Sequence, residues 1–216
     1  MKIVEPSIEI FFHYPLDGMR RYNNAEEWLE LAGRTCYKSE DSITKDSAPK
    51  FVKKLSDLGH HAMLEHSFAS ARIICDRGVT HELVRHRLAS YAQESTRYCN
   101  YRKDKFGNEI SVIQPPGLDE YSFLQWNMAM KCIEESYMNL IEHGVPPQIA
   151  RSVLPICIKT EIVISANLRE WLHIFNLRTS NKAHPQIREL MLKALRIFSE
   201  EIPSMYEDLW NERKPK

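Results

Sequence analysis

The chain has 216 residues, enough for one large domain or two small ones with a buried core, and its 29 basic residues balance 29 acidic ones. Zero net charge excludes a protein-wide basic field for nucleic acid, so any basic function must be local. The sequence lacks an apolar run near the roughly 20 residues that span a bilayer, and its polar start predicts that no signal peptide is present. Five scattered cysteines without a CxxC pair indicate reduced thiols and predict a cytoplasmic protein.

The first half of the chain predicts alternating strands and helices. Strand composition occurs at residues 3–4, 8–12, 68–75, 98–101 and 111–113. Helices are predicted at residues 24–32, at residues 48–58 and from Gly78 or Thr80 to His86. Asn24 caps the first helix and Gly59 ends the second, while Leu83 and Val84 should face inward from the third.

The second half is mainly helical. Residues 120–142 form the clearest predicted helix, because Asp119 caps it, Leu124, Met128 and Tyr137 follow a 3.6-residue period, and Gly144 ends it. A short helix after residues 146–147, a strand at 159–166, a helix after Asn167 and two helices at 185–200 and 203–210 complete the chain. The predicted fold is one α+β domain over residues 1–216, with a mixed β-sheet flanked by several helices.

Residues 85–98 contain three arginines and one histidine but no lysine. Arginine offers a planar fork of donors that matches a phosphate or a pyrimidine edge, whereas lysine is a flexible point charge. Since GxGxxG and GxxxxGK[ST] motifs are missing, a phosphate would have to be bound by side chains and helix N-termini. This stretch at a helix end is therefore the leading candidate for a ligand site, with a solvated basic surface as the alternative.

Two further polar clusters are candidates. The first contains His60, His61, Glu65 and His66. These residues could bind a metal, form hydrogen bonds at a helix-to-strand junction, or face a ligand without a metal. The HExxH spacing of zinc proteases is absent. In the helix after Asn167, residues 169, 173 and 176 share a stripe, and Arg178 follows at its exit. A purely structural histidine in that stripe is an equally good interpretation.

The arginine-rich stretch resembles a known family. Arg85-His86-Arg87, seven further residues and Ser95 fit the RHR-x7-S signature of flavin-dependent thymidylate synthases, the ThyX family. More elements that resemble the family follow in order: Arg34-Thr35-Cys36, His60 with Glu65-His66, Ala150 to Pro155, Asn167 to Arg178 and His184-Pro185-Gln186. Because these elements cover most of the chain, the resemblance is specific, and it implies a ThyX-like α+β fold.

The resemblance implies reductive methylation of dUMP to dTMP at C5 of the uracil. FAD and dUMP would meet at one site, with 5,10-methylenetetrahydrofolate as carbon donor and NADPH as reductant, in a homotetramer with sites shared between subunits. Neither a nucleic acid, a membrane nor a metal is expected as a partner. The flavin contacts carried over are His60, Ala62, Glu65, Arg85, His86, Arg87, Gln93, Asn167, Leu168, Arg169 and His173. The dUMP contacts carried over are Glu82, Leu83, Val84, Arg85, Gln93, Glu94, Ser95, Thr96, Arg97, Arg151 and Arg178.

The resemblance assigns Arg178 the catalytic role of favouring ionisation at the uracil N3, and this agrees with the chemistry of a guanidinium beside an imide. Arg97, Arg151 and backbone N–H groups near Ser95 suit the dianionic phosphate. Ser95 is interpreted as a phosphate donor and not as a nucleophile, which would need a base within reach. Cys99 is interpreted as structural.

The sequence departs from the family pattern at Glu82, Ala92, Gln93, Thr96 and His173, and the loop between Arg178 and His184 is longer than a common form. Gln93 and Glu82 change the charge next to dUMP, so they affect contacts and affinity more than the reaction class.

Two other functions remain as alternatives. A nucleic-acid-binding module would use the arginines and tyrosines of this region as charges and stacking platforms, namely Arg85, Arg87, Arg97, Arg102, Tyr91, Tyr98 and Tyr101. A metallohydrolase would use His60, His61 and His66.

Overall fold

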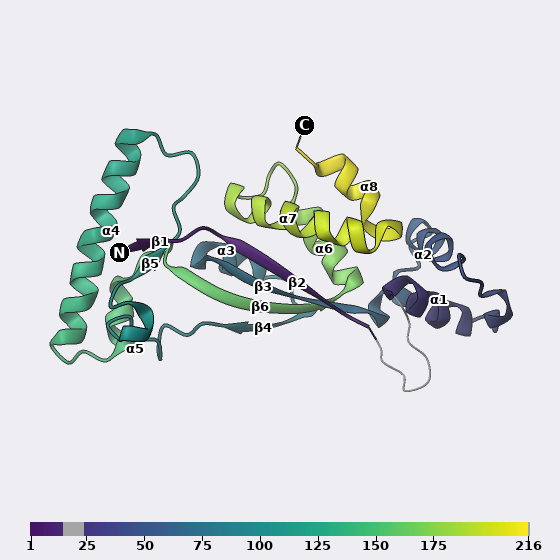
Figure 1. Cartoon of the computed structure of the whole chain (residues 1–216), viewed down its shortest axis with the longest axis horizontal. Coiled ribbons are helices and arrows are strands. Elements are labelled where there is room, and N and C mark those ends of the chain that lie inside the picture. The colour runs from purple at the N-terminus through teal and green to yellow at the C-terminus, as the bar shows by residue number, and fades with distance from the viewer. Residues whose placement is uncertain (15–23, 216) are drawn as a thin grey trace. The chain divides into compact units, whose positions relative to one another are not determined.

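The computed structural model describes residues 1–14 and 24–215. Its strands are β1 (Lys2–Ile3), β2 (Ser7–His13), β3 (Phe68–Asp76), β4 (Ala89–Gln93), β5 (Ser111–Val112) and β6 (Lys159–Asn167). Its α-helices are α1 (Ala25–Thr35), α2 (Ala48–Asp57), α3 (Arg77–Leu83), α4 (Glu120–Glu142), α5 (Pro147–Ala150), α6 (Leu168–Arg178), α7 (Pro185–Glu201) and α8 (Pro203–Arg213). Short 3₁₀ helices are η1 (Glu40–Ser42), η2 (His61–His66), η3 (Asp104–Phe106) and η4 (Arg151–Val153). These elements confirm the predicted α+β class (Figure 1).

Short polar side chains begin α1, α3, α4 and α6. In each case a side-chain oxygen accepts the backbone N–H three residues later, at 2.7–2.9 Å; the capping residues are Asn24, Asp76, Asp119 and Asn167. These bonds satisfy N–H groups that have no partner inside the helix. The predicted caps Asn24, Asp119 and Asn167 are thus confirmed, and so are the bounds of α4.

Strands β2, β3, β6 and β4 form one sheet in that order, and β1 pairs in parallel with β5. Side chains alternate between buried and less buried along β3 and β6, as expected for strands with one covered face. Their fully covered apolar positions include Ala69, Ala71 and Ile73 on β3, and Ile162 and Ile164 on β6.

The chain folds into two compact units. The first unit comprises residues 1–7, 73–85 and 92–163, and the second unit comprises residues 8–72, 86–91 and 164–216. Strands β2, β3, β4 and β6 each contribute residues to both units. The single domain inferred from the sequence stays a prediction.

The core of the second unit is aromatic. Trp171 and Phe175 of α6 pack against Phe198 of α7 and Tyr206 of α8, with ring centroids 5.0–5.8 Å apart. The polar ends of these rings are satisfied, because Trp171 Nε1 donates to the Ala69 carbonyl at 3.0 Å and the Tyr206 hydroxyl donates to the Leu168 carbonyl at 2.7 Å. This packing holds α6, which carries several predicted site residues, in a fixed orientation.

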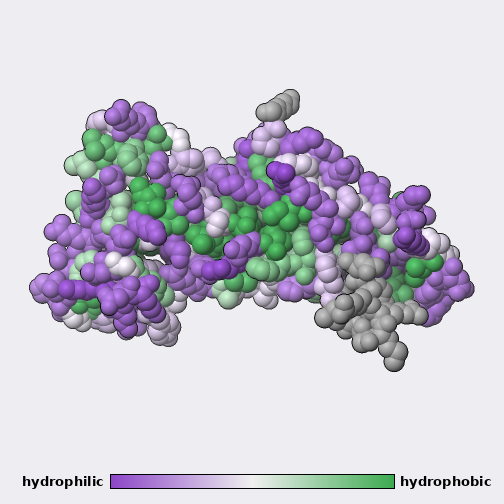
Figure 2. Space-filling view, in the orientation of Figure 1, coloured by the Kyte–Doolittle hydropathy of each residue, from purple (hydrophilic) through white to green (hydrophobic). Residues whose placement is uncertain are grey.

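The first unit has a separate core around α4. Met130 and Tyr137 of α4 pack with apolar side chains that include Tyr101, Ile110, Val112 and Ile158. The N-terminal part of the predicted apolar stripe is not in this core, since Leu124 and Met128 are exposed. Figure 2 shows hydrophobic surface over α4.

Two sequence predictions around the arginine-rich stretch are wrong. Helix α3 ends at Leu83, so Leu83 is buried as predicted but Val84 is exposed. Residues 98–101 form no strand, because the backbone N–H groups of Tyr98 and Cys99 both donate to the Ser95 carbonyl and close a turn. No helix among residues 1–14 and 24–215 has the length and apolar composition to cross a membrane.

Candidate functional site

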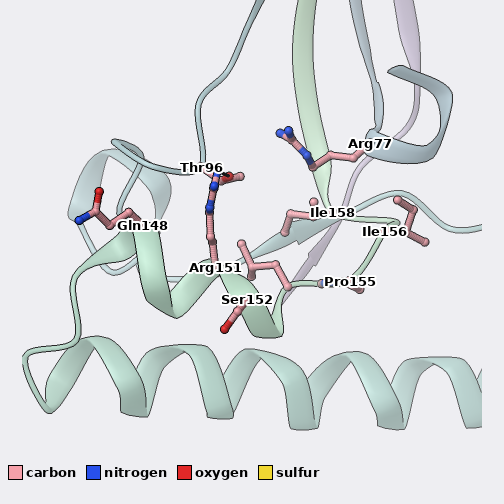
Figure 3. A pocket seen from close by; sticks show the side chains of 9 residues that line it. Arg77, Thr96, Gln148, Arg151, Ser152, Pro155, Ile156 and Ile158 are labelled. Atoms are coloured by element: carbon pink, nitrogen blue, oxygen red, sulfur yellow. Dashed lines mark hydrogen bonds between the residues drawn. The ribbon is translucent and has the colours of Figure 1, made fainter. Parts of the chain in front are cut away.

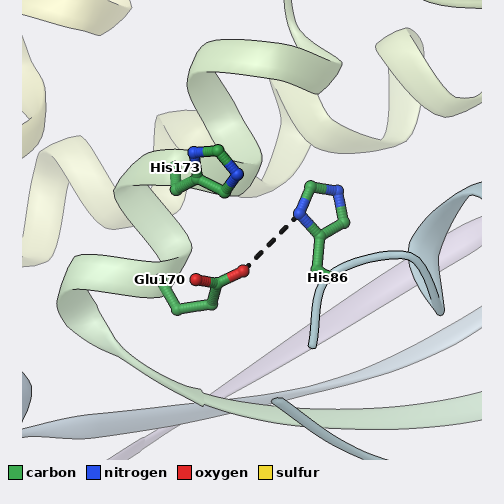
Figure 4. Close-up of side chains that lie close together, drawn as sticks. All are labelled: His86, Glu170 and His173. Carbon is green, nitrogen blue, oxygen red and sulfur yellow. Dashed lines mark ion pairs between the residues drawn. The ribbon is translucent and has the colours of Figure 1, made fainter. Parts of the chain in front are cut away.

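In the second unit, α6 and the turn at residue 86 bring together Glu170, His86 and Arg178. Arg178 Nε donates to His86 Nε2 at 3.1 Å, and His86 Nδ1 lies 3.5 Å from Glu170 Oε1. The imidazole is only 4% exposed and Glu170 is 6% exposed. The His173 ring meets the His86 ring edge to face, with centroids 5.6 Å apart. Figure 4 shows the two imidazoles and the carboxylate converging from α6 and the turn.

The environment keeps His86 neutral. Burial, and then the charges of Arg178 and His173, lower the pKa of His86 to about 4. Because Nε2 accepts a hydrogen bond from a guanidinium, the proton of the neutral ring must be on Nδ1, which faces Glu170. Burial raises the pKa of Glu170 above its usual value.

His86 and Glu170 also form a possible group of metal ligands together with His173. The ligand atoms of His86, Glu170 and His173 all lie within 4.8 Å of one another. However, the Arg178 guanidinium lies against His86 Nε2 and repels a cation there. In the part of the chain that the structure describes, donors converge at this point and not at the His61, Glu65 and His66 group considered from the sequence.

Several predicted flavin contacts line hollows of the second unit. A pocket of about 480 Å³ is lined by Gly33, Cys36, Tyr37, Leu55, Gly59, His60, His61, Ala62, Met63 and Arg169. A second hollow of about 450 Å³ includes Arg169, Glu170 and His173 among its lining residues. Arg169 borders both, and its guanidinium pairs with Glu65. Predicted contacts separated by about a hundred residues in sequence are thus gathered at one face of the unit.

Other members of the predicted flavin set have structural tasks. The Asn167 side chain caps α6, and Leu168 is fully buried, with its N–H donating to the Ser67 carbonyl. Arg87 is exposed in the second unit, whereas Arg85 and Gln93 belong to the first unit.

The first unit holds most of the predicted dUMP contacts. A pocket of about 610 Å³ is lined by Arg77, Thr96, Gln148, Arg151, Ser152, Leu154, Pro155, Ile156 and Ile158. Arg151 Nη1 donates to Thr96 Oγ1 at 3.2 Å, and Figure 3 shows the Arg151 side chain reaching Thr96. Residues 55 positions apart in the sequence therefore form one polar wall.

Arg77 is a candidate that the sequence reasoning missed. It begins α3 and lines the same pocket as Arg151 and Thr96, with Nη1 3.5 Å from the Glu94 carbonyl oxygen. Nothing in its local spacing distinguishes it from a solvated arginine at a helix N-terminus. Only the approach of Thr96 and Arg151 to the start of α3 makes it a site residue.

The segment at residues 93–97 is held by polar contacts within the first unit. Gln93 Nε2 donates to Thr80 Oγ1 and Thr160 Oγ1, at 3.1 and 3.2 Å. Glu94 accepts from Lys159 Nζ at 2.9 Å and from the Tyr101 hydroxyl at 3.0 Å. These bonds fix the backbone on which Ser95, Thr96 and Arg97 are presented.

The contacts of Ser95 and Cys99 do not favour a role as nucleophile for either side chain. Ser95 Oγ accepts the N–H of Arg97 at 3.3 Å, the local bond of a serine turn. Burial, with the charge of Glu94, raises the pKa of the Cys99 thiol, which disfavours the thiolate. The sequence-based interpretation of Cys99 as structural agrees with this.

Comparisons with known proteins agree with the resemblance seen in the sequence. The model of the family described as Thy1, "Thymidylate synthase complementing protein", matches residues 19–204. A flavin-dependent thymidylate synthase from Geobacter sulfurreducens is 34% identical over 193 residues, covering 85% of this chain and 81% of the relative. One from Mycobacterium avium is 32% identical over 200 residues, covering 83% and 78%.

A solved structure shares the fold. The UMP/dUMP methylase PolB from Streptomyces cacaoi, bound with 5-Br dUMP, superposes with a TM-score of 0.77 over 96% of both chains, at 18% sequence identity. The family model matches most of the chain, and both relatives are more than 30% identical to it. The chain therefore belongs to the flavin-dependent thymidylate synthase family.

Proposed function

We propose that this enzyme methylates dUMP at C5 to give dTMP, using 5,10-methylenetetrahydrofolate as the carbon donor and FAD reduced by NADPH as the hydride source. The observation that carries the proposal is that Arg178 lies against His86 of the Arg-His-Arg motif, 92 residues away in the sequence. A guanidinium held in this way can stabilise the anion that forms when the uracil N3 ionises. Flavin, when bound, would supply the hydride chemistry.

The residues of the second unit fit an anionic aromatic cofactor. His60 and Arg169 provide cationic or hydrogen-bonding groups at the rim of the 480 Å³ pocket, and Tyr37, Leu55 and Met63 provide its apolar surface. In the absence of a glycine-rich phosphate loop, such side chains would bind the pyrophosphate. Apart from His86, whose ring is buried, the other flavin contacts carried over by resemblance stay part of this proposal.

The first unit would bind the phosphate of dUMP. Arg151, with Thr96 beside it, offers charge-assisted donors, and we add Arg77 because it borders the same pocket. The dianionic phosphate is matched by two guanidinium groups, while Ser95 and Arg97 contribute from the adjoining turn. Gln93 and Glu94 would mainly hold that turn in place.

The proposed assembly is a homotetramer with shared sites. Tyr121, Leu124 and Met128 on α4 are exposed apolar side chains, and a second copy of the chain would cover them. Leu124→Glu should then lower the oligomer mass measured by light scattering. A mass that stays unchanged would contradict the use of this face.

A visible absorption spectrum of the purified protein tests the function most directly. Adding FAD should give a bound-flavin spectrum, and adding dUMP should change it, because the pyrimidine would lie beside the isoalloxazine. Arg178→Ala should keep the flavin and lose dTMP formation. Failure to bind FAD in excess would refute the cofactor, whereas near-normal turnover of Arg178→Ala would refute only the role of Arg178.

A further inference from the structure

The Arg-His-Arg motif is divided by the fold into residues with opposite environments. Arg85 and Arg87 are exposed, while the His86 ring is almost completely buried. A buried ring has little surface to offer to a ligand. The central residue of the motif therefore needs a different explanation from its neighbours.

We propose that His86 is a positioning residue that orients the Arg178 guanidinium, and that Glu170 fixes the His86 tautomer. This inference rests on the proposed role of Arg178. Arg178 is the last residue of α6, and its long side chain has many rotamers. The hydrogen bond from Nε to His86 Nε2 restricts the plane of the guanidinium.

Each end of the imidazole has a defined partner. Nε2 accepts from Arg178, and Nδ1 faces the buried Glu170 carboxylate. The Tyr91 hydroxyl donates to the His86 carbonyl at 2.8 Å and fixes the backbone of the turn. His173 packs against the ring, so the charged or titratable groups facing His86 are Arg178, Glu170, His173 and Tyr91.

The contact between Arg178 and His86 requires a neutral imidazole. Protonated Nε2 would no longer accept a hydrogen bond and would repel the guanidinium. Burial and the two neighbouring cationic or imidazole groups disfavour that protonation, in agreement with the lowered pKa. The hydrogen bond that Arg178 donates to Nε2 therefore requires the neutral ring.

Two variants of His86 separate positioning from ligand binding. In His86→Gln the amide oxygen can reach the place of Nε2 and accept from Arg178. In His86→Asn the shorter amide reaches the place of Nδ1 only, so it can face Glu170 but not Arg178. We expect His86→Asn to lower kcat for dTMP formation by roughly 10²-fold with flavin still bound, and His86→Gln to restore at least about tenfold of that loss.

The double variant His86→Asn with Arg178→Ala gives the decisive comparison. If His86 acts through Arg178, the double variant should be no slower than Arg178→Ala alone. Multiplied losses, or loss of the flavin spectrum in His86→Asn, would overturn the positioning role. Normal turnover of Arg178→Ala would instead overturn the proposed role of Arg178 and this inference with it.

A measurement on the unaltered protein covers the case in which His86→Asn does not fold. With ¹⁵N-labelled histidine, the Nε2 resonance of His86 at neutral pH should have the shift of an unprotonated, hydrogen-bonded nitrogen, and that of Nδ1 the shift of a protonated one. The opposite tautomer or an imidazolium would refute the arrangement.

Discussion

Replacing His86 with glutamine should make the free energy of unfolding less dependent on pH under acidic conditions. A buried histidine binds a proton less readily than the same residue in the unfolded chain. The folded pKa is about 4 and the ordinary value is 6.5, so the unfolded state binds more protons between these limits. The free energy of unfolding therefore rises with pH in this range.

The size of the effect follows from the two pKa values. The full contribution of His86 is present above its ordinary pKa and is lost as the pH falls towards about 4. At about 1.4 kcal/mol for each pKa unit, the loss is roughly 3 kcal/mol. Solvent screening reduces such a contribution, so roughly 3 kcal/mol is its upper limit.

Urea unfolding followed by circular dichroism, at one protein concentration and at several pH values from about 7 to 4, would measure the effect. The unaltered protein should lose up to about 3 kcal/mol more than His86→Gln over this range. His81→Gln is the matched control, because it makes the same exchange at an exposed position. Parallel curves for His86→Gln would refute the argument that burial excludes the proton.

Three further outcomes are expected. Arg77→Ala and Arg151→Ala should each raise KM for dUMP by about tenfold with a smaller change in kcat, because a phosphate contact is lost. The increase in KM should shrink at high salt, and steady-state kinetics at two ionic strengths would measure it. Gly33→Ala should destabilise the protein by about 1–3 kcal/mol in urea unfolding, because the new Cβ would lie 2.6 Å from the Phe51 ring, and Phe51→Leu should restore part of the loss. Trp171→Ala should cost about 3–5 kcal/mol by the same measurement, since the indole is fully buried among aromatic rings.

Local chemistry explains what the sequence alone determined. Asparagine or aspartate before a helix accepts a nearby backbone N–H, so the starts of α1, α4 and α6 are set by residues adjacent in the chain. The α+β class and the ordered family elements were readable for the same reason. Such signals depend on spacing within a short segment.

Tertiary structure decided which of these elements meet. Tyr98 has the composition of a strand residue, yet its N–H closes a turn on Ser95, because tertiary context outweighs β-propensity. Arg77 looks like any exposed arginine until the fold places Thr96 and Arg151 in its pocket. The contact between His86 and Arg178 joins residues 92 positions apart, so no periodicity or spacing could encode it. Packing of the aromatic core sets the orientation of α6, and that orientation brings the guanidinium to the buried imidazole.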